Sequence, residues 1–321
     1  MSTVTLILPS LFIPTQLAAM GASELMSNSL KKMLARGRSR ATPENSQLEA
    51  HLCKIFSVPV QEDLPIAAIT AKADGLPDGY WLRADPVNLT LRRDRLVLLE
   101  VGVSQDEARH CCEELNAHFA AQGLEFVAPH PQRWYVRLPE CPHIRTTPIQ
   151  QMHGQNVKNQ LPRGPEAPLW HQIFNEVQML LHSLPINKAR EDEGEATINS
   201  VWFWGAGHTP AALCVPAERI SSDLGLVADF AAAAGVPFTP WEPHWDGADL
   251  LVWNAPHYAL QQGNLEHWRA LLRDFEQNYA HPLWQAISNG SIDRLHIDIL
   301  DRDNPRHIEL TRGDAWAFWR R

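Results

Sequence analysis

The most promising chemical feature of this sequence is a pair of glycines that directly follows an apolar run. Ser200–Trp204 is hydrophobic and leads straight into Gly205-Ala206-Gly207-His208. Glycines after a strand let the backbone approach a ligand closely, and the amides of such a turn can hold an anion. The spacing is not that of a dinucleotide-binding loop, and a plain tight turn needs the same glycines. Both interpretations stay open, with Gly205, Gly207 and His208 as candidate ligand contacts.

A second candidate group precedes this turn. Asn187 and Arg190 are three residues apart, so a helix would place both side chains on one face, and Asn199 follows before the apolar run. Arginine and asparagine together can grip a carboxylate or a phosphate. On spacing alone, a capped surface helix explains the same residues equally well.

Arg83 and Asp85 form a third candidate, because they lie close together near the end of an expected strand. Such a pair is either an internal ion pair or half of an anion clamp, and the sequence does not decide between the two.

The sequence shows no spacing typical of a metal centre or of a catalytic nucleophile. Its 15 histidines are scattered without an HxxxH or HExxH pattern, its 5 cysteines include no CxxC, and nothing resembles a nucleophile elbow. We therefore expect no metal and no cofactor. His208 and His257 are the acid–base candidates if the protein is an enzyme.

Hydrophobic periodicity predicts the elements that must position these residues. The expected strands are Thr3–Leu11, Tyr80–Arg83, Asn88–Leu91, Leu96–Leu99, Trp134–Leu138, Ser200–Trp204, Asp249–Val252 and Arg294–Ile299. The expected helices are Ser27–Arg36, Pro43–Phe56, Ser104–Ala121, Leu169–His182, Ile220–Ala234 and Leu265–Tyr279.

Alternation of strands and helices predicts an α/β fold with a largely parallel sheet covered by helices. Residues 67–165 differ in character, because several strands surround one helix there, which predicts an inserted smaller α+β domain. The expected core comprises residues 1–66 and 166–321.

The composition of the chain restricts the classes of partner that we expect the protein to bind. The net charge of −9 and the pI near 5.9 argue against nucleic acid, which requires a basic surface. The apolar start is broken by Pro9 and Pro14 and has no preceding basic residue, so we expect a cytoplasmic protein without a membrane span. The 12 tryptophans pack either a core or a ligand- or protein-binding surface.

Several segments, taken in order, resemble the archaeal-type cofactor-independent phosphoglycerate mutases of the alkaline-phosphatase superfamily. The strongest match is His182–Pro210, and weaker ones follow the chain at Leu30–Gly37, Ser46–Phe56, Asp74–Val87 and Asn254–Asn264. The sequence is also similar to a bacterial group described as phosphoglycerate-mutase-like. The resemblance implies an alkaline-phosphatase-like core with an inserted domain, and it puts Ser46 at the position of the nucleophile.

The sequence departs from this family where the family binds metal. The first strand ends in Leu8-Pro9-Ser10 without an acidic ligand, the late loop carries Asn254, His257 and Gln261, and the adjacent Asp-His pair expected near Leu295–Asp301 is missing. Phosphoryl transfer in this superfamily relies on two metal ions to polarise the phosphate and activate the serine. The resemblance therefore implies that Ser46 is a degenerate nucleophile.

Three functions follow from these observations. The first is a non-catalytic binding or regulatory protein that keeps a pocket for a phosphorylated or carboxylate small molecule or engages a protein partner. Its contacts would be Arg83, Asn187, Arg190, Asn199, Gly205, Gly207 and His208. The second is an active mutase or phosphatase with rearranged or no metal ligands, and the third is a tryptophan-rich protein-interaction module.

Overall fold

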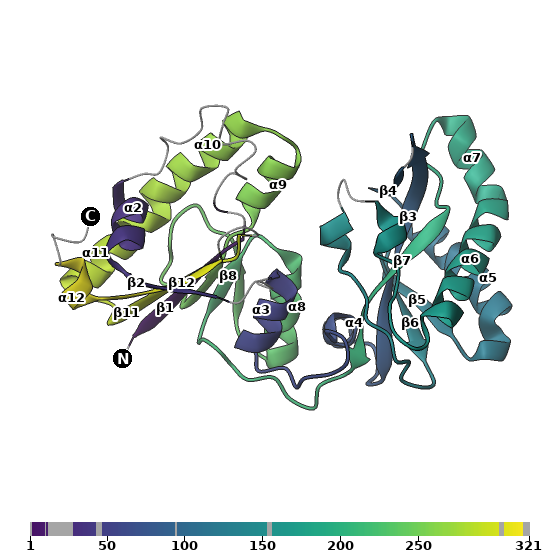
Figure 1. Cartoon of the computed structure of the whole chain (residues 1–321), viewed down its shortest axis with the longest axis horizontal. Coiled ribbons are helices and arrows are strands. Elements are labelled where there is room, and N and C mark those ends of the chain that lie inside the picture. Colours follow the sequence, from purple (N-terminus) through teal and green to yellow (C-terminus); the bar gives the residue numbers. More distant parts are fainter. Residues whose placement is uncertain are drawn as a thin grey trace. The chain divides into compact units, whose positions relative to one another are not determined.

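The chain forms two compact units in the computed structural model (Figure 1). The structure describes residues 2–9, 11, 28–42, 47–93, 95–152, 156–301 and 305–316. Unit 1 combines residues 1–57 with 213–321, and unit 2 comprises residues 58–212.

Unit 1 is built on a seven-stranded sheet in the order β2-β12-β11-β1-β10-β8-β9. The five strands from β11 to β9 run parallel, and β12 and β2 add antiparallel pairs at one end. The strands are β1 (Thr3–Leu8), β2 (Arg38–Ala41), β8 (Ile220–Ser222), β9 (Phe238–Pro240), β10 (Leu250–Val252), β11 (Arg294–Ile299) and β12 (Arg306–Thr311). This arrangement confirms the predicted α/β class with a largely parallel sheet.

Helices cover both faces of this sheet, as Figure 1 shows. One face packs against α2, α10 and α11, with a core that includes Leu6, Met33, Leu283, Ile297 and Ile308. The other face carries α3 and α8, which meet through Phe56 and Phe230 at 5.1 Å between ring centroids. The helices are α2 (Asn28–Arg36), α3 (Leu48–Ile55), α8 (Gly225–Ala234), α9 (Ala255–Gln261), α10 (Leu265–Phe275), α11 (His281–Asn289) and α12 (Arg312–Ala315).

Unit 2 is an antiparallel sheet with helices on its two faces (Figure 1). The long strand β3 is its centre, since it pairs with β4, β6 and β7. The strands are β3 (Tyr80–Arg92), β4 (Arg95–Glu100), β5 (Glu125–His130), β6 (Arg133–Leu138) and β7 (Ser200–His208). The helices are α4 (Ile66–Ala73), α5 (Gln105–Phe119), α6 (Ala167–Ser183) and α7 (Pro185–Glu193).

The boundaries of the inserted unit differ from those expected for it. The sequence suggested 67–165, whereas unit 2 extends from 58 to 212. The reason is strand pairing: β7 hydrogen-bonds along the first half of β3, from Tyr80↔His208 to Val87↔Ser200. The segment 182–208, which includes most of the strongest resemblance to the mutases, therefore lies in unit 2 and not in unit 1.

Three elements also differ from their expected form. Ile220–Ser222 is strand β8 and not the start of a helix, because it fills a buried slot between β9 and β10. The two short strands expected at 80–91 are one strand that continues through Pro86. Helix α10 ends at Phe275 in a π-helical turn, Glu276–Ala280, before α11 begins.

Most of the described tryptophans are core residues. In unit 2, Trp81, Trp134, Trp202 and Trp204 are at most 1% exposed, and in unit 1 Trp253 and Trp268 are buried in the main cluster. Trp316 is 56% exposed, and Trp319 lies outside the described residues. None of the described helices is both long and apolar enough to cross a membrane.

Candidate functional site

The structure divides the predicted ligand contacts into three places within unit 2. Asn187, Arg190 and Asn199 lie on α7 and in the connection from α7 to β7. Arg83 lies on β3, and Gly205, Gly207 and His208 lie on the last part of β7. Ser46, the degenerate nucleophile position, is outside the described residues.

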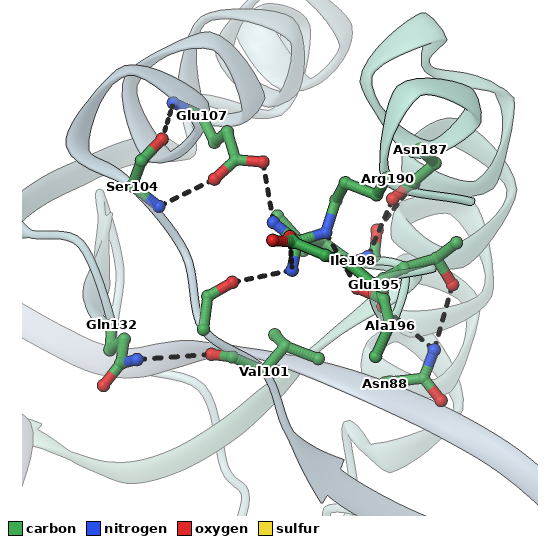
Figure 2. A network of polar contacts seen from close by, with 12 residues as sticks. Asn88, Val101, Ser104, Glu107, Gln132, Asn187, Arg190, Glu195, Ala196 and Ile198 are labelled. Atoms are coloured by element: carbon green, nitrogen blue, oxygen red, sulfur yellow. Dashed lines mark hydrogen bonds and ion pairs between the residues drawn. The ribbon is translucent and has the colours of Figure 1, made fainter. Parts of the chain in front are cut away.

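All three nitrogens of the Arg190 guanidinium donate hydrogen bonds to other groups of unit 2 (Figure 2). Its side chain is 5% exposed, and its three nitrogens donate to Ala196 O at 2.8 Å, Glu107 Oε1 at 2.6 Å and Gly102 O at 2.7 Å. Glu107 also caps α5, since its second oxygen accepts from the Ser104 amide at 2.7 Å. Burial acts to raise the pKa of Glu107, but these hydrogen bonds hold it below its ordinary value.

Asn187 and Asn199 bond to backbone and not to each other. The Asn187 amide bridges Leu181 O and Ile198 O, and its oxygen accepts from Ile198 N at 2.7 Å. Asn199 exchanges two hydrogen bonds with the backbone of Leu89, which continues the ladder between β7 and β3. A ligand role for these residues stays a prediction, and it would require Arg190 to exchange Glu107 for another anion.

Arg83 belongs to an internal ion pair. Its guanidinium meets Asp85 Oδ1 at 2.6 Å, and the two side chains are 11% and 6% exposed. It also lies 5.3 Å and 5.2 Å from the ring centroids of Tyr135 and Trp204. Trp204 Nε1 donates to the second oxygen of Asp85 at 2.7 Å. Of the two interpretations left open by the sequence, the structure favours the ion pair.

Residues Gly205–His208, called the glycine segment below, contact a carboxylate of the protein itself. Ala206 N donates to Asp63 Oδ2 at 3.3 Å, and Thr146 donates to the same oxygen from both its amide and its hydroxyl. Gly205 N donates in turn to Thr146 Oγ1 at 2.8 Å. Burial raises the pKa of Asp63, and the hydrogen bonds oppose that shift. Of the amides expected to hold an external anion, that of Ala206 thus donates to Asp63 and that of Gly205 to Thr146.

The glycines have a packing reason as well. A Cβ on Gly207 would lie 2.4 Å from Pro65 Cβ, and one on Gly205 would lie 3.0 Å from Ala67 N. Gly205 also has a φ of +72°, which side chains disfavour. The glycines therefore let the start of α4 lie directly on β7.

His208 lies at an open cavity of about 400 Å³ in unit 2. Tyr80, Glu125 and Arg137 line the same cavity, and the rings of Tyr80 and His208 meet edge to face at 4.9 Å. Arg137 contacts Glu125 at 3.9 Å and Asp78 O at 3.4 Å, both long contacts. A guanidinium and an imidazole at one cavity are suitable groups for binding a small anion.

Unit 1 contains a separate cluster that sequence analysis did not find. Asp298, on β11, accepts from His51 Nε2 of α3 at 3.1 Å and from His307 Nδ1 of β12 at 2.6 Å. His307 Nε2 lies 3.4 Å from His296 Nδ1. Burial acts to raise the pKa of Asp298, but the two imidazoles hold it below its ordinary value.

These residues do not fit a metal ion. The two imidazoles approach opposite oxygens of Asp298, whereas ligands of one ion must converge on a point about 2 Å from each donor. At the start of the loop 254–264, the Asn254 and Ala255 amides donate to Asp223, 31 residues earlier in the chain, at 2.8 Å and 2.6 Å. Within the part of the chain that the structure describes, no group of three or more His, Cys, Asp or Glu is arranged to hold a metal.

Sequence reasoning missed Asp63, Arg137 and the imidazole cluster for one reason. Asp63 meets Thr146 across 83 residues, Arg137 meets Asp78 across 59, and His51 meets Asp298 across 247. The only local signal was alternation: His296 and Asp298 share one face of β11, opposite to three buried apolar residues.

Comparisons with known proteins give a consistent relationship. The chain is 24% identical over 266 residues to a probable 2,3-bisphosphoglycerate-independent phosphoglycerate mutase of Geobacter sulfurreducens, covering 73% of this chain and 65% of that protein. It is 30% identical over 252 residues to a 2,3-bisphosphoglycerate-independent phosphoglycerate mutase of Methanothrix thermoacetophila, covering 68% and 63%. The chain thus spans somewhat less than two thirds of the length of these relatives. No family model matches it.

A solved structure from Pyrococcus horikoshii has a similar fold, with a TM-score of 0.50 at 14% identity over 97% of this chain and 87% of that one. Homologues of this chain are therefore cofactor-independent phosphoglycerate mutases, which confirms the resemblance seen in the sequence. The α/β class, with a largely parallel sheet and a second, antiparallel sheet, is confirmed as well.

Replacing Arg190 by Met should destabilise unit 2 by about 3 kcal/mol, because Glu107 and two carbonyls lose their buried partner. Urea unfolding followed by circular dichroism measures the change. Arg109→Met is the matched control: Arg109 is on α5, is 65% exposed and pairs with Asp106, so its loss should cost less than about 1 kcal/mol. An Arg190→Met protein of unchanged stability that loses affinity for phosphate would instead make Arg190 a ligand contact.

Gly207→Ala should destabilise the protein by about 2 kcal/mol, since the added methyl group would overlap Pro65 and force α4 away from β7. Gly225→Ala is the control, because a Cβ there meets no atom within 4 Å. Thermal unfolding of both variants tests this packing role. Equal melting temperatures for the two variants would contradict it.

Asp298→Asn should weaken unit 1 at neutral pH by about 2 kcal/mol, because an amide cannot accept from both imidazoles. Asp298 has a lowered pKa in the folded state, so its contribution exists above the unfolded pKa of about 3.9 and disappears as pH falls through the folded value. Hydrogen exchange of β11 and β12 amides between pH 3 and pH 7 measures this effect. Exposed Asp274→Asn should leave the exchange unchanged.

Proposed function

We propose that this chain is a non-catalytic relative of the phosphoglycerate mutases, one that has lost the metal centre and works by binding a small phosphorylated or carboxylate molecule. The observation that carries this proposal is the pairing of Asp298 with His51 and His307 through opposite oxygens. Both oxygens of the carboxylate accept from an imidazole, and the second ring nitrogen of His307 lies 3.4 Å from His296 Nδ1. Chemistry that needs a metal-activated nucleophile has no convergent ligands among the described residues of unit 1.

The other polar groups of this region support the same conclusion. Both oxygens of Asp223 accept backbone amides at the start of α9. In the same helix, Gln261 Nε2 lies 2.8 Å from His257 Nε2, so this histidine also has an internal partner. The end of β1 is apolar, with Leu8 and Leu11 each 1% exposed.

We assign the ligand to the cavity of unit 2 beside His208. Arg190, Arg83 and the amide of Ala206 already serve internal carboxylates, whereas the Arg137 guanidinium has only long contacts. Arg137 and His208 would bind the anionic group, and Tyr80 would pack against the carbon skeleton. A cavity of about 400 Å³ lies within the usual range for small ligands.

Because the relatives are phosphoglycerate mutases, 3-phosphoglycerate is the first ligand to test. The purified protein should not convert it to 2-phosphoglycerate, with or without Mn²⁺, Zn²⁺ or Mg²⁺. The protein should bind 3-phosphoglycerate in the presence of a chelator. Binding raises the free energy of unfolding by RT ln(1 + [L]/Kd), about 2.7 kcal/mol at a hundredfold excess over Kd, and so raises the melting temperature. Arg137→Met should abolish the thermal shift.

Arg109→Met, an exposed arginine of the same unit, should keep that shift. Turnover that depends on added metal would contradict the non-catalytic proposal, and it would favour an active mutase with rearranged ligands. Binding that is unaffected by Arg137→Met would contradict the assignment to this cavity.

A further inference from the structure

The cavity beside His208 lies at the ends of four strands of unit 2. Tyr80 begins β3 and Glu125 begins β5, whereas Leu138 ends β6 and His208 ends β7. Arg137, the residue before Leu138, also lines the cavity. The lining therefore includes a carboxylate as well as a guanidinium and an imidazole, so its ligand has to suit charges of both signs.

Strand register makes Glu125 and Arg137 neighbours. They are directly opposed between β5 and β6, so their side chains lie on the same face of the sheet. Glu125 Oε2 and Arg137 Nη1 are 3.9 Å apart, which is longer than the roughly 3 Å of a hydrogen bond, and the two side chains are 59% and 42% exposed. An ion pair this open to solvent contributes little to stability, so a ligand can take its place at low cost.

The Arg137 guanidinium is positioned by packing more than by hydrogen bonds. It lies 5.9 Å from the ring centroid of Trp81, and a Cβ on Gly79 would be 3.1 Å from Arg137 Nε. Gly79 therefore lets the guanidinium lie against the backbone just before β3. Since the contact with Asp78 O is 3.4 Å long, most of the five N–H donors of Arg137 remain available to a ligand.

The other side chains at the cavity leave this balance of charge unchanged. Burial raises the pKa of Tyr80, and the carboxylates of Asp63 and Glu62 act in the same direction, so the Tyr80 hydroxyl keeps its proton. The ring nitrogens of His208 make no hydrogen bond within the described part of the chain, and its ring contacts Tyr80. Arg137 and a protonated His208 are thus opposed by the negative charge of Glu125.

We propose that the ligand of this cavity carries an ammonium group next to an anionic group, as an amino acid or a phosphorylated amino acid does, and that Glu125 selects it. This inference rests on the proposed function and names the class of its ligand. The ammonium and carboxylate groups of an α-amino acid are attached to one carbon atom, so they can meet Glu125 and Arg137 at the same time. Both contacts are charge-assisted. A ligand with negative charge alone would place a like charge near Glu125, which lowers affinity.

A cross-strand ion pair can also stabilise a sheet without any ligand. Glu125→Gln separates the two roles. If the pair only stabilises the sheet, the substitution changes the free energy of unfolding and leaves the choice between ligands as it was. If Glu125 contacts the ligand, the substitution changes that choice.

The test is calorimetric titration of the full chain with 3-phosphoglycerate and with O-phospho-L-serine, at constant ionic strength and with a chelator present. These two compounds differ in the group on one carbon atom, hydroxyl in the first and ammonium in the second. We expect O-phospho-L-serine to bind about tenfold more tightly, the effect of one charge-assisted hydrogen bond. Glu125→Gln should weaken its binding about tenfold and should not weaken the binding of 3-phosphoglycerate.

Glu113→Gln is the matched control, because Glu113 is a 65% exposed carboxylate of α5 in the same unit, and this variant should keep the preference. L-Serine as a third titrant shows whether the anionic group that accompanies the ammonium is a phosphate or the carboxylate alone.

The possible failures are distinguishable. Equal affinities for the two phosphorylated compounds, both lost in Arg137→Met, would overturn this inference and leave the proposed function standing. A preference that persists in Glu125→Gln would overturn the role of Glu125. Binding of neither compound would overturn the inference together with the assignment of the ligand to this cavity.

Discussion

A carboxylate removed from water must find hydrogen-bond donors, because desolvation of its charged form is costly unless amides, hydroxyls or cations replace the lost water. This requirement organises both units. Asp63 draws the glycine segment and Thr146 together, Glu107 joins α5 to Arg190, and Asp298 links α3 to β11 and β12. In each case the donors are groups that a ligand-binding protein would offer to an external anion. In this chain these donors bind carboxylates of the protein itself.

The same hydrogen bonds occur in the segments that resemble the phosphoglycerate mutases. Arg190 and the glycine segment sit in the inserted unit, where they fix α7 and α4 on the sheet. Unit 1 has a largely parallel sheet, and Asp223 and Asp298 near its strand ends accept hydrogen bonds from groups of the same unit. Sequence similarity therefore persists in segments whose hydrogen bonds now serve folding.

The cavity beside His208 is open to solvent in unit 2, and Tyr80, Glu125 and Arg137 line it. The Arg137 guanidinium lies 3.9 Å from Glu125 and 3.4 Å from Asp78 O. Tryptophans, by contrast, offer little contact surface, because Trp81, Trp202 and Trp253 are packed in the interior. These three buried rings are therefore not available as an aromatic contact surface.

The sequence by itself determined the features that depend on neighbouring residues. Periodicity located β11 at Arg294–Ile299, and the Ser104–Glu107 spacing identified the capped start of α5, because both patterns repeat within a few residues. Alternating strands and helices likewise indicated the α/β class. Only the tertiary structure decided which side chains and strands pair. Trp204 donates to Asp85 across 119 residues, and β7 belongs to unit 2 because it pairs with β3. Such partners are chosen by strand pairing and burial in three dimensions, which leave no fixed spacing in the chain.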